Sequence, residues 1–329
     1  MTTAWYTNSA WLFPLRPLSA VFQTFGALRR RYLLWRYRLR SYSAPVVVVG
    51  NIAIGGSGKT PLLIALVKYL AAHGFNPGVV SRGYKGSRCS GPMMVMADSD
   101  VVKTGDEALL IARSCSCSVV VDSDRHRAVK YLLENSHCDV VLSDDGLQHY
   151  AMPRDIEIAV IDGSRGFGNR LCLPAGPLRE PASRLSSVDF IAVNGAGRLD
   201  NAASEHSSFN LVPVRFVNLL SGESCLASEW SGTTSVHAVA AIGAPQRFAA
   251  TLGSLGLNVR LHAHGDHRTL SPSDLCFKDK LDVIITAKDA IKLNASDRVN
   301  LWYLEVAATI DDQFAEDLVA RLTTMRRDV

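Results

Sequence analysis

Short apolar runs alternate with helical patterns along most of the chain, and glycine or proline turns separate them. Four consecutive valines at 46–49 predict a buried parallel strand, because helices cover both faces of such a strand and leave no polar alternation. Similar runs predict further strands at 78–80, 119–121, 139–145, 156–161 and 188–193, with helices at 62–72, 108–112 and 128–133. This alternation indicates an α/β fold with a largely parallel sheet.

The pattern changes near residue 195. A polar stretch at 195–208 precedes an extended segment at 209–220, and a second strand-and-helix rhythm begins at Val236. Strands are expected there at 236–242, 258–262, 282–286 and 301–306, followed by a C-terminal helix. We therefore predict four parts: an N-terminal helix over 1–40, a P-loop core domain over 41–208, a short β linker over 209–230, and a smaller α/β domain over 231–329 that closes over the site.

A glycine-rich turn joins the valine strand to the next helix. It contains Gly55, Gly56, Ser57 and Gly58, and Lys59-Thr60 then opens the helix. Strand, loop and helix N-terminus together form a phosphate cradle, in which backbone N–H groups and the helix dipole favour an anion. In such a loop the lysine binds phosphates and the threonine hydroxyl binds Mg²⁺. The first glycine of a Walker A loop is replaced by Ala53, and a chance Gly-Lys-Thr turn is the alternative.

Four other places carry candidate chemistry. Arg82 follows a strand at the ligand edge of the sheet and is either a phosphate contact or a surface arginine. Asp106 starts a helix and is either a helix cap or a catalytic group. Asp144-Asp145 ends an apolar strand as a Walker B pair for Mg²⁺ or as a plain turn. His267 beside Asp266 is either an oriented imidazole or part of an ordinary surface loop.

Composition narrows the class of protein. The chain has 329 residues, enough for two domains, and its 47% hydrophobic and 20% charged content is typical of a folded globular protein. The net charge of +4 says little by itself. Seven cysteines without a CxxC pair indicate a reduced chain rather than a disulfide framework or a zinc site.

The N-terminal segment combines aromatic residues with a dense arginine cluster between Arg29 and Arg40. Its charge-free run is too short and too polar to span a bilayer, and it is a poor signal peptide. A helix from Pro17 to Arg40 fits an interfacial helix with arginines on anionic headgroups. A helix packed on the domain and an arm for nucleic acid are the alternatives.

Taken together, the motifs resemble the tetraacyldisaccharide 4′-kinase family. The matching segments, in order, are GNIAIGGSGKTP (50–61), SRGY (81–84), GDEALLIA (105–112), SDDGLQH (143–149), DIEIAVID (155–162), PAGPLREP (174–181), GDHRTLSPSDL (265–275) and TAKDAIKL (286–293). The resemblance implies transfer of the γ-phosphate of MgATP to the 4′-hydroxyl of an acylated disaccharide 1-phosphate lipid, giving lipid IVA in lipid A biosynthesis. It also implies a monotopic enzyme on anionic lipids at the cytoplasmic face of the inner membrane, with the site between two α/β/α domains.

Matching positions suggest roles. Lys59 and Thr60 would serve the phosphates and Mg²⁺, Asp106 would act as the base on the acceptor hydroxyl, and His267 would be its partner. The other candidates divide into nucleotide and metal groups, which are Gly55, Gly56, Ser57, Gly58, Arg82 and Gln148 for ATP, and Thr60, Asp144, Asp145 and Glu180 for Mg²⁺. Two positions depart from the family pattern, Arg268 replacing a histidine and Ala287 a glutamate.

We expect a monomer that does not bind nucleic acid. One alternative function is a membrane-associated P-loop switch of the partition-ATPase or GTPase type. In residues 286–289 the lysine lies one position further along the chain than in a guanine-binding motif, which argues against a GTPase. The other alternative is a cytosolic small-molecule kinase or ligase in which the N-terminal segment only packs.

Overall fold

Strand β1 (Val46–Gly50) lies at the centre of the larger half of the molecule and is buried along its whole length. Val47 and Val49 point into one hydrophobic core, whereas Val46 and Val48 point into another. The unbroken valine run therefore arises because both faces of this strand are covered.

The computed structural model describes residues 3–7, 9–83, 91–195, 197, 206–293 and 300–325. Within these residues, thirteen strands form one sheet in the order β11-β10-β12-β13-β8-β7-β6-β1-β5-β2-β4-β3, with β9 paired to β8. The strands after β1 are β2 (Pro77–Ser81), β3 (Met93–Val95), β4 (Ser118–Val121), β5 (Val140–Asp144), β6 (Ile156–Asp162), β7 (Phe190–Asn194), β8 (Ser207–Asn218), β9 (Ser224–Leu226), β10 (Ser235–Ala240), β11 (Asn258–Ala263), β12 (Asp282–Thr286) and β13 (Leu301–Ile310). Strand β1 lies between β5 and β6 and is parallel to both, which places the glycine loop beside the end of the acidic strand.

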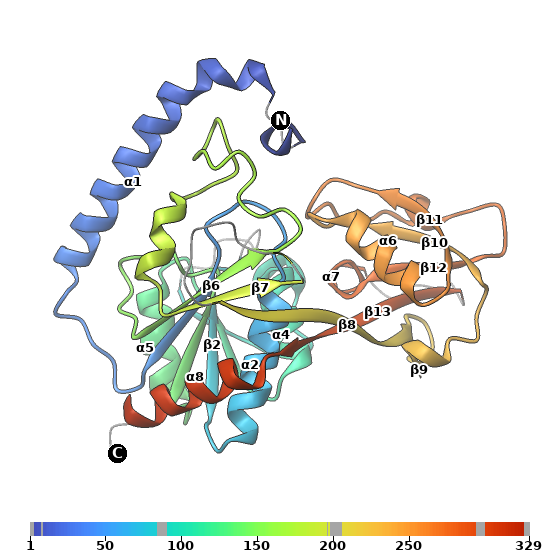
Figure 1. Ribbon diagram of the computed structural model, residues 1–329. Coiled ribbons are helices and arrows are strands. Elements are labelled where there is room, and N and C mark those ends of the chain that lie inside the picture. Colours follow the sequence, from blue (N-terminus) through green and yellow to red (C-terminus); the bar gives the residue numbers. More distant parts are fainter. Residues whose placement is uncertain are drawn as a thin grey trace.

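Helices cover both faces of the sheet in the larger half (Figure 1). Leucines and other apolar side chains of α2, α4 and α8 pack into the core that contains Val47, while α5 and the segments that follow β5 and β6 pack on the opposite face. The helices of the body are α2 (Lys59–Ala72), α3 (Val101–Thr104), α4 (Asp106–Ser114), α5 (Arg125–Asn135), α6 (Pro245–Ser254), α7 (Ala287–Ala290) and α8 (Asp312–Met325).

The smaller half is built on the parallel strands β11, β10, β12 and β13. Helix α6 covers one face, and the loop before β12 covers the other together with α7. Strand β13 then runs antiparallel to β8 over most of its length, so this ribbon carries the sheet from one half into the other (Figure 1). The domain limits given above stay a prediction.

The N-terminal segment consists of the 3₁₀ helices η1 (Thr3–Tyr6) and η2 (Ala10–Leu15) and of helix α1 (Arg16–Arg36), which lies at the periphery of the molecule in Figure 1. All of α1 is described, and Ser19 is its one buried residue. Most of the exposed large apolar residues of α1 are spaced three or four positions apart and form one stripe, which consists of Leu18, Val21, Phe22, Phe25, Leu28, Tyr32 and Trp35. The exposed Leu34 lies outside this stripe. None of the helices in the described ranges is long and apolar enough to cross a bilayer.

The α/β class with a mainly parallel sheet is confirmed. The structure adds the antiparallel edge strand β3, whose three residues gave no strand pattern in the sequence. Tyr84 of the SRGY motif and most of the polar stretch at 195–208 lie outside the described residues.

Candidate active site

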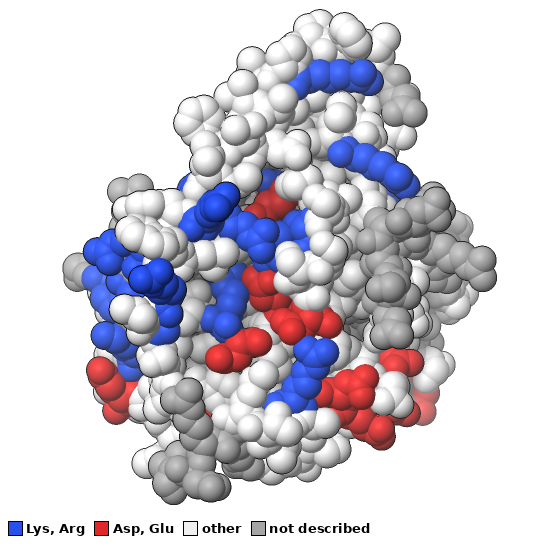
Figure 2. Space-filling view, turned by 60° about the vertical axis from the view of Figure 1, so that its left-hand side comes forward, with Lys and Arg blue, Asp and Glu red and all other residues white. Residues whose placement is uncertain are grey.

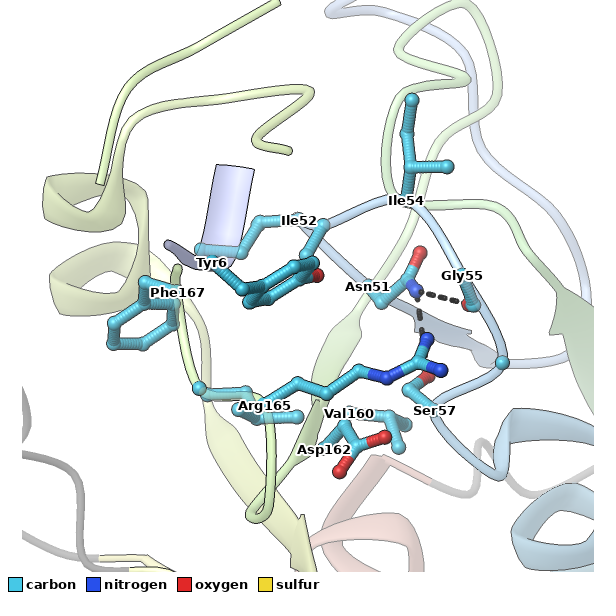
Figure 3. Close-up of a pocket in the computed structure, with 14 residues that line it drawn as sticks. Tyr6, Asn51, Ile52, Ile54, Gly55, Ser57, Val160, Asp162, Arg165 and Phe167 are labelled. Atoms are coloured by element: carbon cyan, nitrogen blue, oxygen red, sulfur yellow. Dashed lines mark hydrogen bonds between the residues drawn. The ribbon is translucent and has the colours of Figure 1, made fainter. Parts of the chain in front are cut away.

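The glycine loop after β1 is braced from two strands. Asn51, which follows β1, donates from its amide to the carbonyl of Gly55 (3.4 Å) and to the hydroxyl of Ser57 (3.3 Å), as Figure 3 shows. Asn194, at the end of β7, donates to the carbonyl of Ser57 at 3.1 Å. Gly58 has φ +89°, and a Cβ there would lie 2.5 Å from the Asn194 amide nitrogen, so the position requires glycine. The loop is therefore held in shape before any ligand arrives.

The paired aspartates lie next to this loop but in different environments. Both carboxylate oxygens of Asp144 are buried, and no residue in the described part of the chain hydrogen-bonds to them. Burial, with the charges of Glu107 and Asp145, raises the pKa of Asp144. Burial also acts to raise the pKa of Asp145, but the charges of Lys59 and Arg179 outweigh it and leave that pKa lowered. Asp145 lies 3.6 Å from the Lys59 ammonium and 3.0 Å from the Arg179 guanidinium.

Arg125 is a site residue that the sequence did not predict, because it lies between the strand expected at 119–121 and the helix expected at 128–133. Its side chain is buried behind β5 and donates to the backbone carbonyl of Asp144 at 2.6 Å. The Nε and Nη1 atoms are buried without a hydrogen-bond partner among the described residues. Burial lowers the pKa of Arg125 to about 10 against the opposing charges of Asp144 and Asp145. An arginine in the first turn of a helix that follows a sheet strand was the available signal.

Glu180 lies beside Gln148, Tyr150 and Arg184. Its carboxylate accepts from Gln148 at 3.1 Å and from the Tyr150 hydroxyl, and Arg184 lies 3.9 Å away. Across the described ranges, no group of three or more His, Cys, Asp or Glu side chains is arranged to hold a metal ion. Arg82 is exposed at the end of β2, with its charge close enough to act on the pKa of Arg125.

The structure brings Asp106 and His267 together, although 161 positions separate them. Asp106 begins α4 in the larger half, and its Oδ2 lies 3.2 Å from Nδ1 of His267 in the smaller half. Lys292 and Lys288, which the sequence gave no role, lie 3.8 Å and 4.0 Å from the same oxygen. Burial alone would raise the pKa of Asp106, but the hydrogen bond from His267 and the charges of Lys288, His267 and Lys292 leave that pKa lowered. Asp106 is therefore ionised at neutral pH.

A buried network holds His267 in an unusual backbone conformation. His267 has φ +60°, which costs a non-glycine residue about 1–3 kcal/mol unless its surroundings enforce it. Its N–H donates to the carbonyl of Ala241, whose own N–H donates to the buried carboxylate of Asp289 (both 3.0 Å). Lys292 donates to Asp289 at 3.0 Å and to the carbonyl of Arg268 at 3.3 Å. The side chain of Arg268 instead binds Asp274.

The smaller half also touches the glycine loop. A Cβ at Gly243 would lie 3.0 Å from the N atom of Gly56 and 3.3 Å from the Asp266 carboxylate. Arg165, after β6, donates to the Gly243 carbonyl at 2.8 Å, and Arg247 of α6 forms an ion pair with Asp162. In the space-filling view of Figure 2, basic and acidic side chains lie side by side in the middle of the face. Loop, paired aspartates and Asp106–His267 pair thus form one continuous site between the two halves.

Three comparisons bear on this arrangement. The family model LpxK, described as tetraacyldisaccharide-1-P 4′-kinase, matches residues 11–323. The tetraacyldisaccharide 4′-kinase of Hahella chejuensis is 44% identical over 328 residues, covering 98% of this chain and 96% of that protein. That of Pseudomonas aeruginosa is 42% identical over 324 residues with the same coverage. A crystal structure of LpxK from Aquifex aeolicus is described as an "apo" form in complex with ATP. It matches this structure with a TM-score of 0.74 and 24% sequence identity, over 96% of this chain and 100% of that chain. This match supports the fold.

Proposed function

This chain belongs to the tetraacyldisaccharide-1-P 4′-kinase family, and we propose that it transfers the γ-phosphate of ATP to the 4′-hydroxyl of a tetraacyldisaccharide 1-phosphate, giving lipid IVA in lipid A biosynthesis. The observation that carries this proposal is the contact of Asp106 with His267 beside the glycine loop. The phosphate cradle and the ionised Asp106 carboxylate both belong to the larger half, and both lie where the smaller half touches it, which is an arrangement suited to phosphate transfer onto a hydroxyl.

The larger half holds the triphosphate. The backbone of residues 55–58 and the N-terminus of α2 surround the β- and γ-phosphates, and Lys59 leaves Asp145 to pair with them. The buried Arg125 carries two side-chain nitrogens that have no hydrogen-bond partner among the described residues, and its charge offsets the negative charge that develops there during transfer. Arg82 and Gln148 complete the nucleotide contacts. Because transfer needs little covalent chemistry from the protein, positioning and charge account for most of the rate.

The residues present fit a Mg²⁺ ion. Asp144 buries two carboxylate oxygens that have no hydrogen-bond partner among the described residues, and burying them is costly unless a cation joins them. Hard cations prefer such oxygen ligands. Thr60, Asp144 and Asp145 would hold the ion, with Glu180 as a further candidate. The bound ion would neutralise phosphate charge and align the β- and γ-phosphates.

The two halves together supply the base. Asp106 accepts the proton of the sugar 4′-hydroxyl, and His267 orients that carboxylate from the smaller half. The pair assembles only when residues 231–329 close onto residues 41–208, across the linker at 209–230. Since the base is incomplete in an open molecule, ATP hydrolysis without acceptor is limited.

The N-terminal segment brings this site to its lipid. The apolar stripe of α1 is exposed, with Phe25 69% and Leu28 60% accessible, which is unusual for so many large apolar residues on one helix. The upper part of the face in Figure 2 is largely uncharged, and the charges that it shows are basic. We propose that a monomer lies on anionic lipids at the cytoplasmic face of the inner membrane, with residues 1–40 as the contact.

The direct test supplies γ-labelled ATP and a tetraacyldisaccharide 1-phosphate and measures label in the lipid with and without Mg²⁺. We expect label in the lipid only when Mg²⁺ is present. GTP in place of ATP distinguishes a kinase from a switch protein, and label that appears only as free phosphate would contradict the proposal.

A further inference from the structure

The first residues of the chain pack against the loop that follows β6. Trp5 is only 7% exposed, and its indole N–H donates to the carbonyl of Pro174 at 3.1 Å. The carbonyl of Trp5 accepts from the backbone N–H of Asn169 at 2.8 Å. Ser19 of α1 adds a second attachment, because its hydroxyl donates to the carbonyl of Cys172 (2.7 Å) and accepts from the N–H of Ala175 (3.0 Å). Two residues of the N-terminal segment, Trp5 and Ser19, thus hold one loop, residues 163–181.

The far side of that loop pairs with the Walker A loop. The N–H of Ile54 donates to the carbonyl of Pro177 at 2.8 Å, and the N–H of Arg179 donates to the carbonyl of Ile52 at 2.6 Å. Between them, Ala53 and Leu178 form an antiparallel bridge. The segment 177–179 is therefore a short partner strand for the first half of the phosphate loop. The next side chain in this path, that of Arg179, contacts Asp145.

Tyr6 lies next to both the loop of residues 163–181 and the Walker A loop. Figure 3 shows Tyr6 and Phe167 on one side of a small pocket and Arg165 reaching across it toward Gly55 and Ser57. The packing around Gly168 is tight. A Cβ at this position would lie 2.8 Å from the carbonyl oxygen of Trp5, 3.0 Å from Pro177 and 3.2 Å from the Tyr6 ring. A change at residues 5 and 6 therefore reaches Pro177, whose carbonyl holds Ile54.

We propose that Trp5 and Tyr6 are positioning residues of the nucleotide site, which act through residues 163–181 on the Walker A loop. The N-terminal segment then has two separable faces, because Trp5 is buried against the loop whereas Trp11 is 50% and Phe25 69% exposed. The inner face sets ATP affinity, and the outer face contacts lipid. This inference rests on the proposed nucleotide site.

Two substitutions of the same kind test it, Trp5→Ala and Trp11→Ala in the full chain. ATP binding is measured at equilibrium without lipid, and binding to anionic vesicles is measured by sedimentation. We expect W5A to weaken ATP binding about fivefold or more, the equivalent of one lost hydrogen bond with some packing, and to leave vesicle binding within about twofold. We expect W11A to do the reverse. In kinetics, W5A should raise KM for ATP more than it lowers kcat.

Two further variants make the result decisive. Lys59→Ala tests the nucleotide site itself, and full ATP affinity in K59A would overturn the proposed function rather than this inference. If K59A loses ATP affinity while W5A remains folded by circular dichroism and binds ATP as the unmodified chain does, the inference is wrong. Should W5A fail to fold, Trp5→Phe decides, since it keeps the ring and removes only the indole N–H. An unchanged ATP affinity in W5F would then count against the inference, and an intermediate one would support it.

Discussion

Substitution of Asp106 and His267 tests the base that the two halves assemble. We consider Asp106→Asn, His267→Ala and the double variant. Asparagine keeps the shape of the side chain but cannot accept the proton. The fold should survive, because Lys288 retains its ion pair with Glu107 (2.8 Å) and Lys292 retains Asp289 (3.0 Å) when the carboxylate is lost.

The expected magnitudes follow from the contacts. A general base contributes about 10² to 10⁴ in rate, so D106N should lower kcat by that range. His267 contributes one charge-assisted hydrogen bond, which is worth about 1.5–3 kcal/mol, or about 10- to 160-fold in rate. Lys292 and Lys288 still lie 3.8 Å and 4.0 Å from the Asp106 oxygen in H267A. We therefore expect H267A to lower kcat about tenfold, which is the lower end of that range.

The assay is turnover of γ-labelled ATP into lipid at saturating substrates, with ATP affinity measured separately. Since His267 acts through Asp106, the double variant should be no slower than D106N alone. Near-full turnover in both single variants would refute the assignment. Effects that multiply in the double variant would show that the two residues act independently.

Four other predictions concern the same site and the membrane. Lys292→Met removes a charge that lowers the pKa of Asp106, so the acid limb of the kcat–pH profile should move to higher pH and K292R should restore it; an unmoved limb would contradict the role of Lys292. Because the pKa of Asp106 is lower in the folded chain, its ionised carboxylate stabilises the fold at pH values above the unfolded-state pKa. This stabilisation is lost as the pH falls through the folded-state pKa. The difference in unfolding free energy between the unmodified chain and D106N should therefore shrink over that pH range. Gly58→Ala should destabilise the fold by about 1–2 kcal/mol or more in denaturant titrations, because the position has positive φ and no room. Gly56→Ala, which meets no atom within 4 Å, should stay within about 0.5 kcal/mol, and equal effects would refute the steric argument. Deletion of residues 1–40 should release the protein from anionic liposomes, and unchanged sedimentation would remove the membrane proposal.

Part of the site was predictable because its signals are local. Lys59 and Thr60 begin the helix that follows β1, and the pair Asp144-Asp145 lies at the end of β5. Strands β1 and β5 are parallel neighbours, so their carboxyl ends meet at one edge of the sheet, and residues placed by local pattern at strand ends are brought together. The strands and helices were predictable as well, because apolar runs and glycine turns are also local features of the sequence.

For other residues the local pattern did not show which distant residues they contact. Arg125 lies before the helix expected at 128–133, yet α5 begins at Arg125, and its packing against β4 and β2 places this side chain next to the paired aspartates. Trp5 reads as one more aromatic residue of a lipid-facing segment, yet it is buried against the loop after β6. In both cases the deciding contact comes from a distant element, which periodicity within a short window does not report.

The sequence by itself determined the α/β class, the phosphate loop, the acidic strand end and the amphipathic N-terminal segment, because each depends on the order of neighbouring residues. No local pattern joined Asp106 to His267; the family resemblance implied the pair, and the tertiary structure brings the two side chains into contact. Asp106 and His267 are 161 positions apart, and each had an ordinary structural alternative as a helix cap or a loop residue. Their contact exists because the β8–β13 ribbon holds the smaller half against the larger one, and long-range packing of that kind is not encoded in any single stretch of the chain.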